Sequence, residues 1–342
     1  MRAFRLIAHG APGRFELGEV PDPVPSTGEV LVRVAACGLN HLDLWLEEAG
    51  LPIALELPRI PGCEIAGVVE QPGPEVSEWH AGDRVAVQSN LFCGTCEFCQ
   101  KGEESLCLQG SILGVQRDGG FAEKVTVPAR ALVRLPDAVD FTTSAALTLA
   151  GSTAMRMLTS RTQVGPGDWV LVVGGASGVG SAAIQIASGL GAKVVATGST
   201  PAKRDLAMRL GAHLAVDSED PRWPALVRKA TGRRGVDVVI EHVGGTVLRQ
   251  VFECLARGGT VVTCGATAGR DVQFDLWPFF VKQQRLVGSY GRSRADLQRT
   301  LEWVEAGRLR PVIHEVVALE RALEAFAALR ARRVLGKMVI QP

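Results

Sequence analysis

Several residue types and patterns are scarce in this chain of 342 residues. It has one tyrosine and two asparagines, Asn40 and Asn90, a scarcity that fits either heat adaptation or a bias in base composition. The formal net charge is +1, and no basic run alternates with aromatic residues, so a nucleic-acid surface is not indicated. No segment reaches the length of a transmembrane span, and the N-terminal MRAFRLIAHGAPGRF lacks the apolar stretch of a signal peptide. We therefore expect a cytoplasmic protein with neither nucleic-acid nor membrane partners, in a compartment where thiols stay reduced.

What is present describes a globular protein, with 46% hydrophobic and 21% charged residues. The length exceeds that of one ordinary core and favours two domains. Residues 1 to about 135 are β-rich, with short apolar runs such as Val30–Ala36, Ile65–Glu70 and Arg84–Gln88 between prolines and glycines. The residue pattern then changes, and small and apolar residues at helical spacing over Asp140–Arg156 predict a helix.

Strands and helices alternate in the next hundred residues. The predicted strands are Asp168–Gly174, Lys193–Thr197, Leu214–Val216, Val236–Glu241 and Thr260–Cys264; the predicted helices between them are Gly178–Gly191, Ala202–Leu210, Trp223–Thr231 and Val247–Ala256. This order predicts an α/β fold with a doubly wound parallel sheet. The tail returns to a mixed pattern, with helices expected over Ala295–Ala306 and Leu319–Ala331 and a final strand over Gly336–Ile340.

Four cysteines lie within fifteen residues, in the run CGTCEFCQKGEESLC. The spacing C-x2-C-x2-C-x7-C lets four thiolates turn toward one centre and complete a tetrahedral zinc shell. Such a shell leaves no open position, so the zinc is expected to be structural. Two disulfides or four unrelated thiols are the alternatives, but a loop this short has no core to shape it without metal. The predicted ligands are Cys93, Cys96, Cys99 and Cys107.

A glycine-rich turn follows the strand predicted at 168–174 and opens the next helix, in the run WVLVVGGASGVGSAAIQIA. Glycines at such a turn let the backbone approach a pyrophosphate at the helix N-terminus, where free N–H groups favour negative charge. The alternative is a glycine-rich turn without a ligand. Candidate cofactor-binding residues here are Gly175, Ser177, Gly178, Val179 and Gly180.

The second strand of this region ends without an acidic residue. A carboxylate at that point binds the ribose hydroxyls of NAD and repels the 2′-phosphate of NADP. This chain has Gly198, Ser199 and Thr200 there, and Lys203 and Arg204 lie one helical turn later, so NADP is favoured over NAD. The two basic residues fit an ordinary solvated helix face equally well. His242 and Val243 follow the strand predicted at 236–241, Cys264 and Gly265 end or follow the one at 260–264, and these four residues complete the cofactor candidates.

In combination, several further runs give a resemblance to a known superfamily. They are Gly28–Val34, Cys37–Asp43, Pro61–Val69, Ala81–Val85 and Asp118–Glu123. With the cysteine lobe first and the dinucleotide fold second, the chain resembles the medium-chain dehydrogenase/reductase superfamily of alcohol dehydrogenases and quinone reductases. The resemblance implies a GroES-like catalytic domain (1–145 and 290–342, with a zinc lobe near 90–110) and a Rossmann domain (146–289). It also implies a homodimer or homotetramer.

The chain departs from the zinc alcohol dehydrogenases where their second, catalytic zinc is held. The three ligand positions of that motif correspond to Asn40, Cys63 and Leu149, and only the cysteine is a good zinc ligand. The usual site is therefore absent, although Cys37, Asp43, Cys63 and Glu64 leave an unconventional metal site open. Cys37 itself is most simply a buried small hydrophobe.

The resemblance also marks the remaining candidate catalytic positions. Thr153 corresponds to a threonine beside the nicotinamide ring, and Cys264 ends a strand where the family's backbone faces that ring. His41 corresponds to a residue near the pyrophosphate and is otherwise a surface histidine. Asn40 resembles the asparagine that faces the cleft in zinc-free quinone reductases. The candidate catalytic set is Asn40, His41, Asp43, Cys63, Glu64 and Thr153, and Cys264 stays among the cofactor candidates.

A site without a Lewis acid suits acceptors that need little polarisation. We expect hydride transfer from NADPH to a quinone or α,β-unsaturated carbonyl, with one hydrogen bond from Asn40 or a water steadying the charge on oxygen. A zinc-binding alcohol dehydrogenase acting on alcohols and aldehydes is the first alternative. A cofactor-binding or cofactor-sensing protein without turnover is the second.

Overall fold

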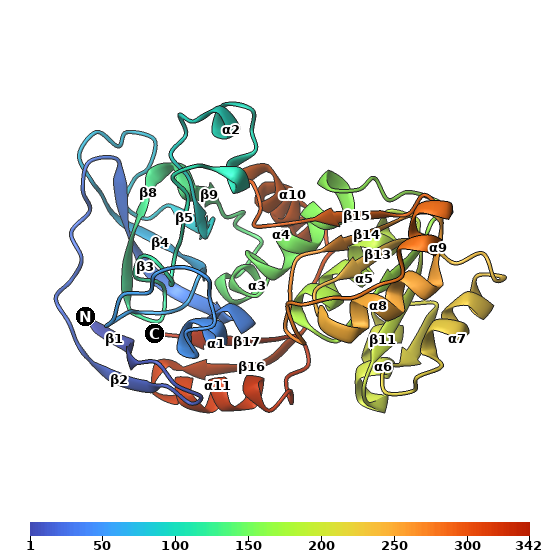
Figure 1. Ribbon diagram of the computed structural model, residues 1–342. Helices are drawn as coiled ribbons and strands as arrows, with labels where there is room; N and C mark the ends of the chain where they lie inside the picture. Colours follow the sequence, from blue (N-terminus) through green and yellow to red (C-terminus); the bar gives the residue numbers. More distant parts are fainter. The chain divides into compact units, whose positions relative to one another are not determined.

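The computed structural model describes all 342 residues and divides into two compact units (Figure 1). One unit contains residues 1–152 and 291–342, and the other contains residues 153–290. The boundaries expected from the sequence were 145/146 and 289/290, whereas the structure has them at 152/153 and 290/291. The first unit is thus built from both ends of the chain. No helix in either unit combines the length and the apolar character that crossing a membrane requires.

The first unit is built on a seven-stranded sheet around the long strand β3 (Glu29–Leu39). The sheet order is β16-β17-β3-β4-β5-β9, and β8 also pairs with β3. The other strands of this sheet are β4 (Glu64–Pro72), β5 (Arg84–Val87), β8 (Lys124–Pro128), β9 (Leu132–Arg134), β16 (Ile313–Ala318) and β17 (Lys337–Gln341). Two further pairs form separate two-stranded sheets: β1 (Arg2–Ala8) with β2 (Arg14–Glu19), and β6 (Asn90–Leu91) with β7 (Ser111–Ile112). The helices are α1 (His41–Glu47), α2 (Glu97–Gln100), α3 (Phe141–Ala145), α10 (Arg294–Glu305) and α11 (Ala322–Arg330).

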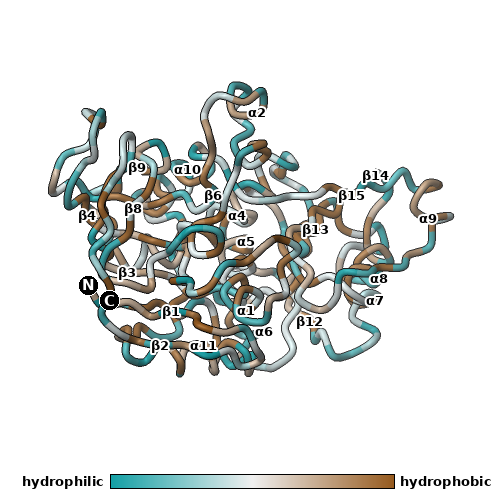
Figure 2. Tube along the Cα trace, turned by 60° about the vertical axis from the view of Figure 1, so that its left-hand side comes forward, coloured by the Kyte–Doolittle hydropathy of each residue, from teal (hydrophilic) through white to brown (hydrophobic).

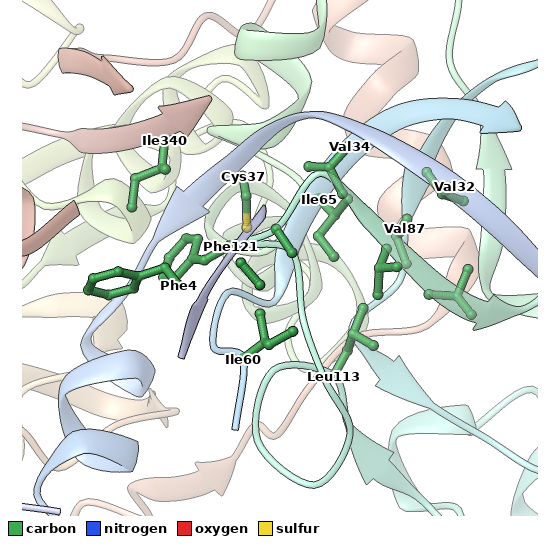
Figure 3. Packing of buried hydrophobic residues seen from close by; sticks show 14 of the residues in the cluster. Phe4, Val32, Val34, Cys37, Ile60, Ile65, Val87, Leu113, Phe121 and Ile340 are labelled. Carbon is green, nitrogen blue, oxygen red and sulfur yellow. The ribbon is translucent and has the colours of Figure 1, made fainter. Parts of the chain in front are cut away.

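Alternation along β3 directs one set of side chains into the core of this unit. Val32 and Cys37 from β3 lie with Ile65 from β4 and with Phe121, and all four are buried (Figure 3). Each such apolar side chain contributes roughly 1.5–3 kcal/mol when it is removed from water. Burial also raises the pKa of the Cys37 thiol well above its ordinary value. Cys37 is therefore a core residue, as the sequence indicated.

The second unit is a six-stranded sheet in which every pair of neighbours is parallel, in the order β12-β11-β10-β13-β14-β15. Its strands are β10 (Trp169–Val172), β11 (Lys193–Gly198), β12 (Leu214–Asp217), β13 (Val236–Glu241), β14 (Leu255–Thr263) and β15 (Arg285–Gly288); its helices are α5 (Gly178–Gly189), α6 (Pro201–Arg209), α7 (Trp223–Ala230), α8 (Gly245–Cys254) and α9 (Leu276–Val281). This is the doubly wound order 3-2-1-4-5-6. The predicted α/β fold class is confirmed.

The apolar strands explain why this sheet is buried on both faces. Runs such as Trp169–Val172 and Val236–Glu241 carry almost no alternation, which is typical of parallel strands covered by helices on both sides. Figure 2 colours each residue of the chain trace by its hydropathy, with hydrophobic residues in brown. Between β10 and β13 the strand order reverses direction, and ligands of such sheets bind at the carboxyl ends of the strands at that point.

The prediction of one helix over Asp140–Arg156 was wrong. The structure has α3, a break at residues 146–149, and α4 (Ala150–Met155), which continues as a π-helical turn over Arg156–Ser160. The break has a local cause, because the Glu64 carboxylate accepts the N–H groups of Leu149 and Ala150 and so starts a new helix there. Helix α9 and strands β15 and β16 were not predicted.

Candidate functional site

The four cysteines of the loop Cys93–Cys107 converge, as their spacing predicted. Their sulfur atoms all lie within 4.8 Å of one another, and the Cys96 Sγ is 3.5 Å from that of Cys99 and 3.9 Å from that of Cys107. Zinc–sulfur bonds of about 2.3 Å in a tetrahedron place the sulfurs roughly 3.8 Å apart, whereas a disulfide needs about 2.05 Å. All four are free thiols, so the geometry fits zinc and excludes the two disulfides.

Hydrogen bonds prepare this lobe for a cation. Cys93 Sγ accepts from the Thr95 amide and hydroxyl and from the Cys96 amide, and these bonds lower the pKa of the Cys93 thiol to about 5. The short antiparallel pair β6–β7 closes the loop at its base. The thiolates would hold a structural zinc, and no ligand position remains for substrate.

A second cluster lies where the sequence comparison placed the catalytic zinc ligands, and it contains a residue that the sequence did not single out. Lys337, in β17, is only 4% exposed, and its Nζ lies 2.6 Å from Glu64 Oε2. The same Nζ donates to Asn40 Oδ1 at 2.6 Å and to the Leu39 carbonyl at 2.8 Å. All three donors of the ammonium group are thereby used.

The Glu64 carboxylate and the Asn40 amide are equally occupied. Glu64 Oε1 accepts from the amides of Leu149 and Ala150 at 2.6 and 2.8 Å. Asn40 Nδ2 donates to Glu64 Oε2 at 2.9 Å and to the Gly38 carbonyl at 3.2 Å. Both Nδ2 protons have acceptors inside the protein, so the expected hydrogen bond from Asn40 to a substrate oxygen is not available in this arrangement.

The remaining candidates around this cluster serve the fold. Asp43 Oδ2 accepts a hydrogen bond from the backbone N–H of Asn40 at 2.8 Å, and Asp43 Oδ1 accepts one from the backbone N–H of Gly62 at 3.0 Å. Burial raises the pKa of Asp43 to about 6, and these two hydrogen bonds act in the opposite direction. Cys63 is fully buried, and burial raises the pKa of its thiol far above the ordinary value, so it is a thiol and not a thiolate.

A catalytic zinc does not fit the residues of this cluster. In the whole chain, the cysteines at 93, 96, 99 and 107 are the only group of three or more His, Cys, Asp or Glu side chains that converge as metal ligands. Cys37, Asp43, Cys63 and Glu64 do not form such a group, so the structure contradicts the unconventional metal site. An ammonium ion, itself a cation, pairs with the carboxylate of Glu64, which follows the cysteine at the second ligand position.

The dinucleotide turn joins β10 to α5. Ser177 is the N-cap of α5, and its Oγ accepts the Gly180 amide at 2.9 Å. A Cβ on Gly180 would lie 2.2 Å from the Gly174 carbonyl oxygen, so the turn requires glycine at 180. The amides of Gly178 and Val179 open the first turn of a twelve-residue helix, a fitting cradle for a pyrophosphate. Gly175 packs against Ala196 in the neighbouring strand.

The loop after β11 has no acidic residue, and its basic neighbours are held close. Lys203 Nζ donates to Ser199 Oγ at 3.2 Å, and Thr200 caps α6. Arg204 donates to the Gly198 carbonyl at 3.0 Å and pairs with Asp217 at 2.9 Å. Lys203 thus directs its charge toward the loop, whereas Arg204 is neutralised by Asp217.

The carboxyl end of β13 carries a buried acid that the sequence did not single out. Glu241 is 0% exposed and accepts the amides of Val243 and Gly244 and the Thr263 hydroxyl. It fixes the loop that presents His242 and Val243. A Cβ on Gly265 would lie 2.4 Å from the His242 carbonyl oxygen, so the chain after Cys264 also needs glycine.

Two candidate catalytic residues remain. Thr153 is buried in α4, and His41 is the exposed first residue of α1.

Comparisons with known proteins agree with this architecture. Residues 26–137 match the family model described as the alcohol dehydrogenase GroES-like domain, and residues 178–306 match the one described as zinc-binding dehydrogenase. An alcohol dehydrogenase of Geobacillus stearothermophilus is 32% identical over 95% of this chain and 96% of its own length. The chain belongs to the zinc-containing alcohol dehydrogenase family.

Two similar solved structures are informative. An NAD-dependent alcohol dehydrogenase is 39% identical, covers 100% of both chains and superposes with a TM-score of 0.96. A crotonyl-CoA carboxylase/reductase in complex with NADP is 25% identical, covers 100% of this chain and 94% of that chain, and has a TM-score of 0.91. The protein is thus an NAD(P)-dependent oxidoreductase of the zinc alcohol dehydrogenase type.

Proposed function

We propose that this enzyme transfers hydride from NADPH to a quinone or an α,β-unsaturated carbonyl compound and that its only zinc is structural. The observation that carries the proposal is the closed network in which Lys337 and Glu64 occupy the side chain of Asn40, the residue at the first of the family's zinc-ligand positions. With Leu149 at the third position, no metal is available to polarise a simple ketone.

Without a catalytic metal, the reaction depends on the cofactor and on an acceptor that needs little polarisation. NADPH supplies the hydride. Delivered to the β-carbon of a conjugated carbonyl, it produces an enolate whose charge is spread over the conjugated system, and the enolate takes its proton from water. The chain's own contribution is to hold the cofactor and substrate in a reactive geometry. The crotonyl-CoA carboxylase/reductase among the similar structures is named for an α,β-unsaturated thioester, which supports this substrate class.

The second candidate is the oxidation of simple alcohols, as the names of the alcohol dehydrogenase relatives suggest. The third is cofactor binding without turnover. The preference for NADPH rests on the loop Gly198–Thr200, which lacks a carboxylate, and on Lys203 beside Ser199. A cytoplasmic location, where thiols stay reduced, suits the four-thiolate lobe.

One experiment separates the three candidates. We expect purified protein to contain one zinc per chain by elemental analysis. NADPH should be oxidised with menadione and with a simple enal but not with ethanal, and a chelator strong enough to strip a catalytic zinc should leave this activity intact. Two zinc ions per chain together with chelator-sensitive oxidation of ethanol would establish the second candidate. Tight NADPH binding without oxidation by any acceptor would establish the third.

A further inference from the structure

His242 lies at the point in the second unit where a dinucleotide's phosphates are expected. Strands β10 and β13 are neighbours at the switch in strand order, and Val173 and His242 extend their carboxyl ends. The Val173 amide donates to the Ile240 carbonyl at 3.0 Å, which keeps the two ends side by side. The imidazole therefore borders the glycine turn from the adjacent strand.

The contacts of the ring are with the turn itself. His242 Nε2 is 3.4 Å from Ser177 Oγ, and a Cβ on Gly174 would lie 3.2 Å from the ring's Cε1. The ring also has a hydrogen-bond interaction with the Val173 backbone. Because Ser177 Oγ already accepts the Gly180 amide, its own proton is free to point at Nε2. This pattern suits a neutral imidazole with Nε2 as acceptor.

The charges around the ring are few. Glu241 precedes it on β13, but that carboxylate is held by two backbone amides and the Thr263 hydroxyl. Cys264 extends the neighbouring strand β14, and the turn 174–180 contributes no titratable side chain. Burial lowers the pKa of His242 below its ordinary 6.5, and Glu241 acts in the opposite direction. Without cofactor, burial therefore favours the uncharged ring.

We propose that His242 contacts the phosphates of the bound dinucleotide directly and takes up one proton from solvent when the cofactor binds. A pyrophosphate at the N-terminus of α5 would bring negative charge to Ser177, whose Oγ is already within 3.4 Å of Nε2. An imidazolium ion has donors on both ring nitrogens, so it serves Val173 and a phosphate together. The inference rests on the cofactor site of the family and not on the choice of carbonyl substrate.

Proton uptake gives cofactor binding a pH dependence of known sign. The bound state holds the proton more tightly, so affinity is highest at low pH and falls as pH rises from the free-state to the bound-state pKa of His242. A one-proton linkage changes Kd by at most about tenfold per pH unit in this window. NADH is the suitable probe, because the 2′-phosphate of NADPH titrates near pH 6 itself.

The test compares Kd for NADH between pH 5.5 and 8.5, by nicotinamide fluorescence, in the wild type, His242→Gln and His80→Gln. Glutamine keeps a hydrogen-bonding group but cannot titrate, and His80 is an exposed residue of the other unit. We expect the Kd for NADH to rise with pH in the wild type and in His80→Gln, and to stay constant with pH in His242→Gln. Equal slopes in all three proteins would overturn the proposal.

Calorimetry supplies an independent readout. In buffers of different ionisation enthalpy, the wild type should take up a fraction of a proton per NADH bound at pH 7, and His242→Gln should take up less. If that variant does not fold, NMR titration of the six histidines of the wild type replaces it, and no histidine pKa rising on NADH addition would refute the proposal. Failure of the wild type to bind NADH or NADPH at all would instead refute the cofactor assignment.

Discussion

At the scale of single residues, Lys337 determines the charge balance of the buried cluster. Its ammonium group and the Glu64 carboxylate are 4% and 0% exposed as residues, so each is a costly charge that the other compensates. The pair also fixes Asn40 and, through Glu64, the start of α4. Lys337, the first residue of β17, therefore has a structural and an electrostatic role.

Lys337→Met should destabilise the protein by about 3–5 kcal/mol at pH 7, because it leaves an unpaired carboxylate in the core. Chemical denaturation measures the loss, and the exposed Lys229→Met is the control. The double variant Lys337→Met/Glu64→Gln should recover part of the stability. A single variant as stable as the control at pH 7 would show that the ion pair is unimportant.

At the scale of elements, the zinc lobe depends on metal more than on packing. Its helix α2 has four residues and buries none of them, and the strand pair β6–β7 at its base is only two residues long. A segment with so little core gains its order from ligand bonds. The lobe should therefore loosen as one unit when a ligand is lost.

Cys96→Ser should reduce zinc from one ion per chain to nearly none and lower the melting temperature. Hydrogen exchange should accelerate over residues 93–110 while the sheet of the second unit keeps its protection. Cys254→Ala is the control, because that buried thiol lies in α8 of the other unit and should leave the zinc content unchanged. A Cys96→Ser protein that retains a full zinc ion would mean that this cysteine is not a ligand.

Elements also show how far the sequence could predict the structure. Four closely spaced cysteines and a glycine turn between strand and helix are local patterns, and both were found where expected. The break in the helix near Leu149 and the pairing of Lys337 with Glu64 depend on residues 85 and more positions away in the chain, which no local period reveals. The lysine directly before the apolar residues 338–340 was the one available signal. Strand β15 was missed because its four residues show neither alternation nor a continuous buried run.

At the scale of the whole molecule, the segment 276–290 of the second unit carries several large apolar side chains that are exposed. The edge strand β15 has no neighbour on its outer side, and Leu286 on it is 40% exposed. Nearby in sequence, Trp277 and Phe280 of α9 pack edge to face and remain 70% and 53% exposed, and Tyr290 is 59% exposed. An unpaired strand edge beside exposed apolar side chains favours association. A second copy, related by a twofold axis, offers the same edge and the same aromatic pair in return.

We therefore expect the wild type to elute at the mass of two or four chains of 36.3 kDa in size-exclusion chromatography with light scattering. Trp277→Glu combined with Leu286→Arg should shift it toward one chain, because charges on this surface would be buried without partners. Leu323→Glu is the matched control: Leu323 is 54% exposed but lies on α11 of the first unit, so this change should leave the mass unaltered. A monomeric wild type would refute the association, and an unchanged mass in the double variant would place the contact on another surface.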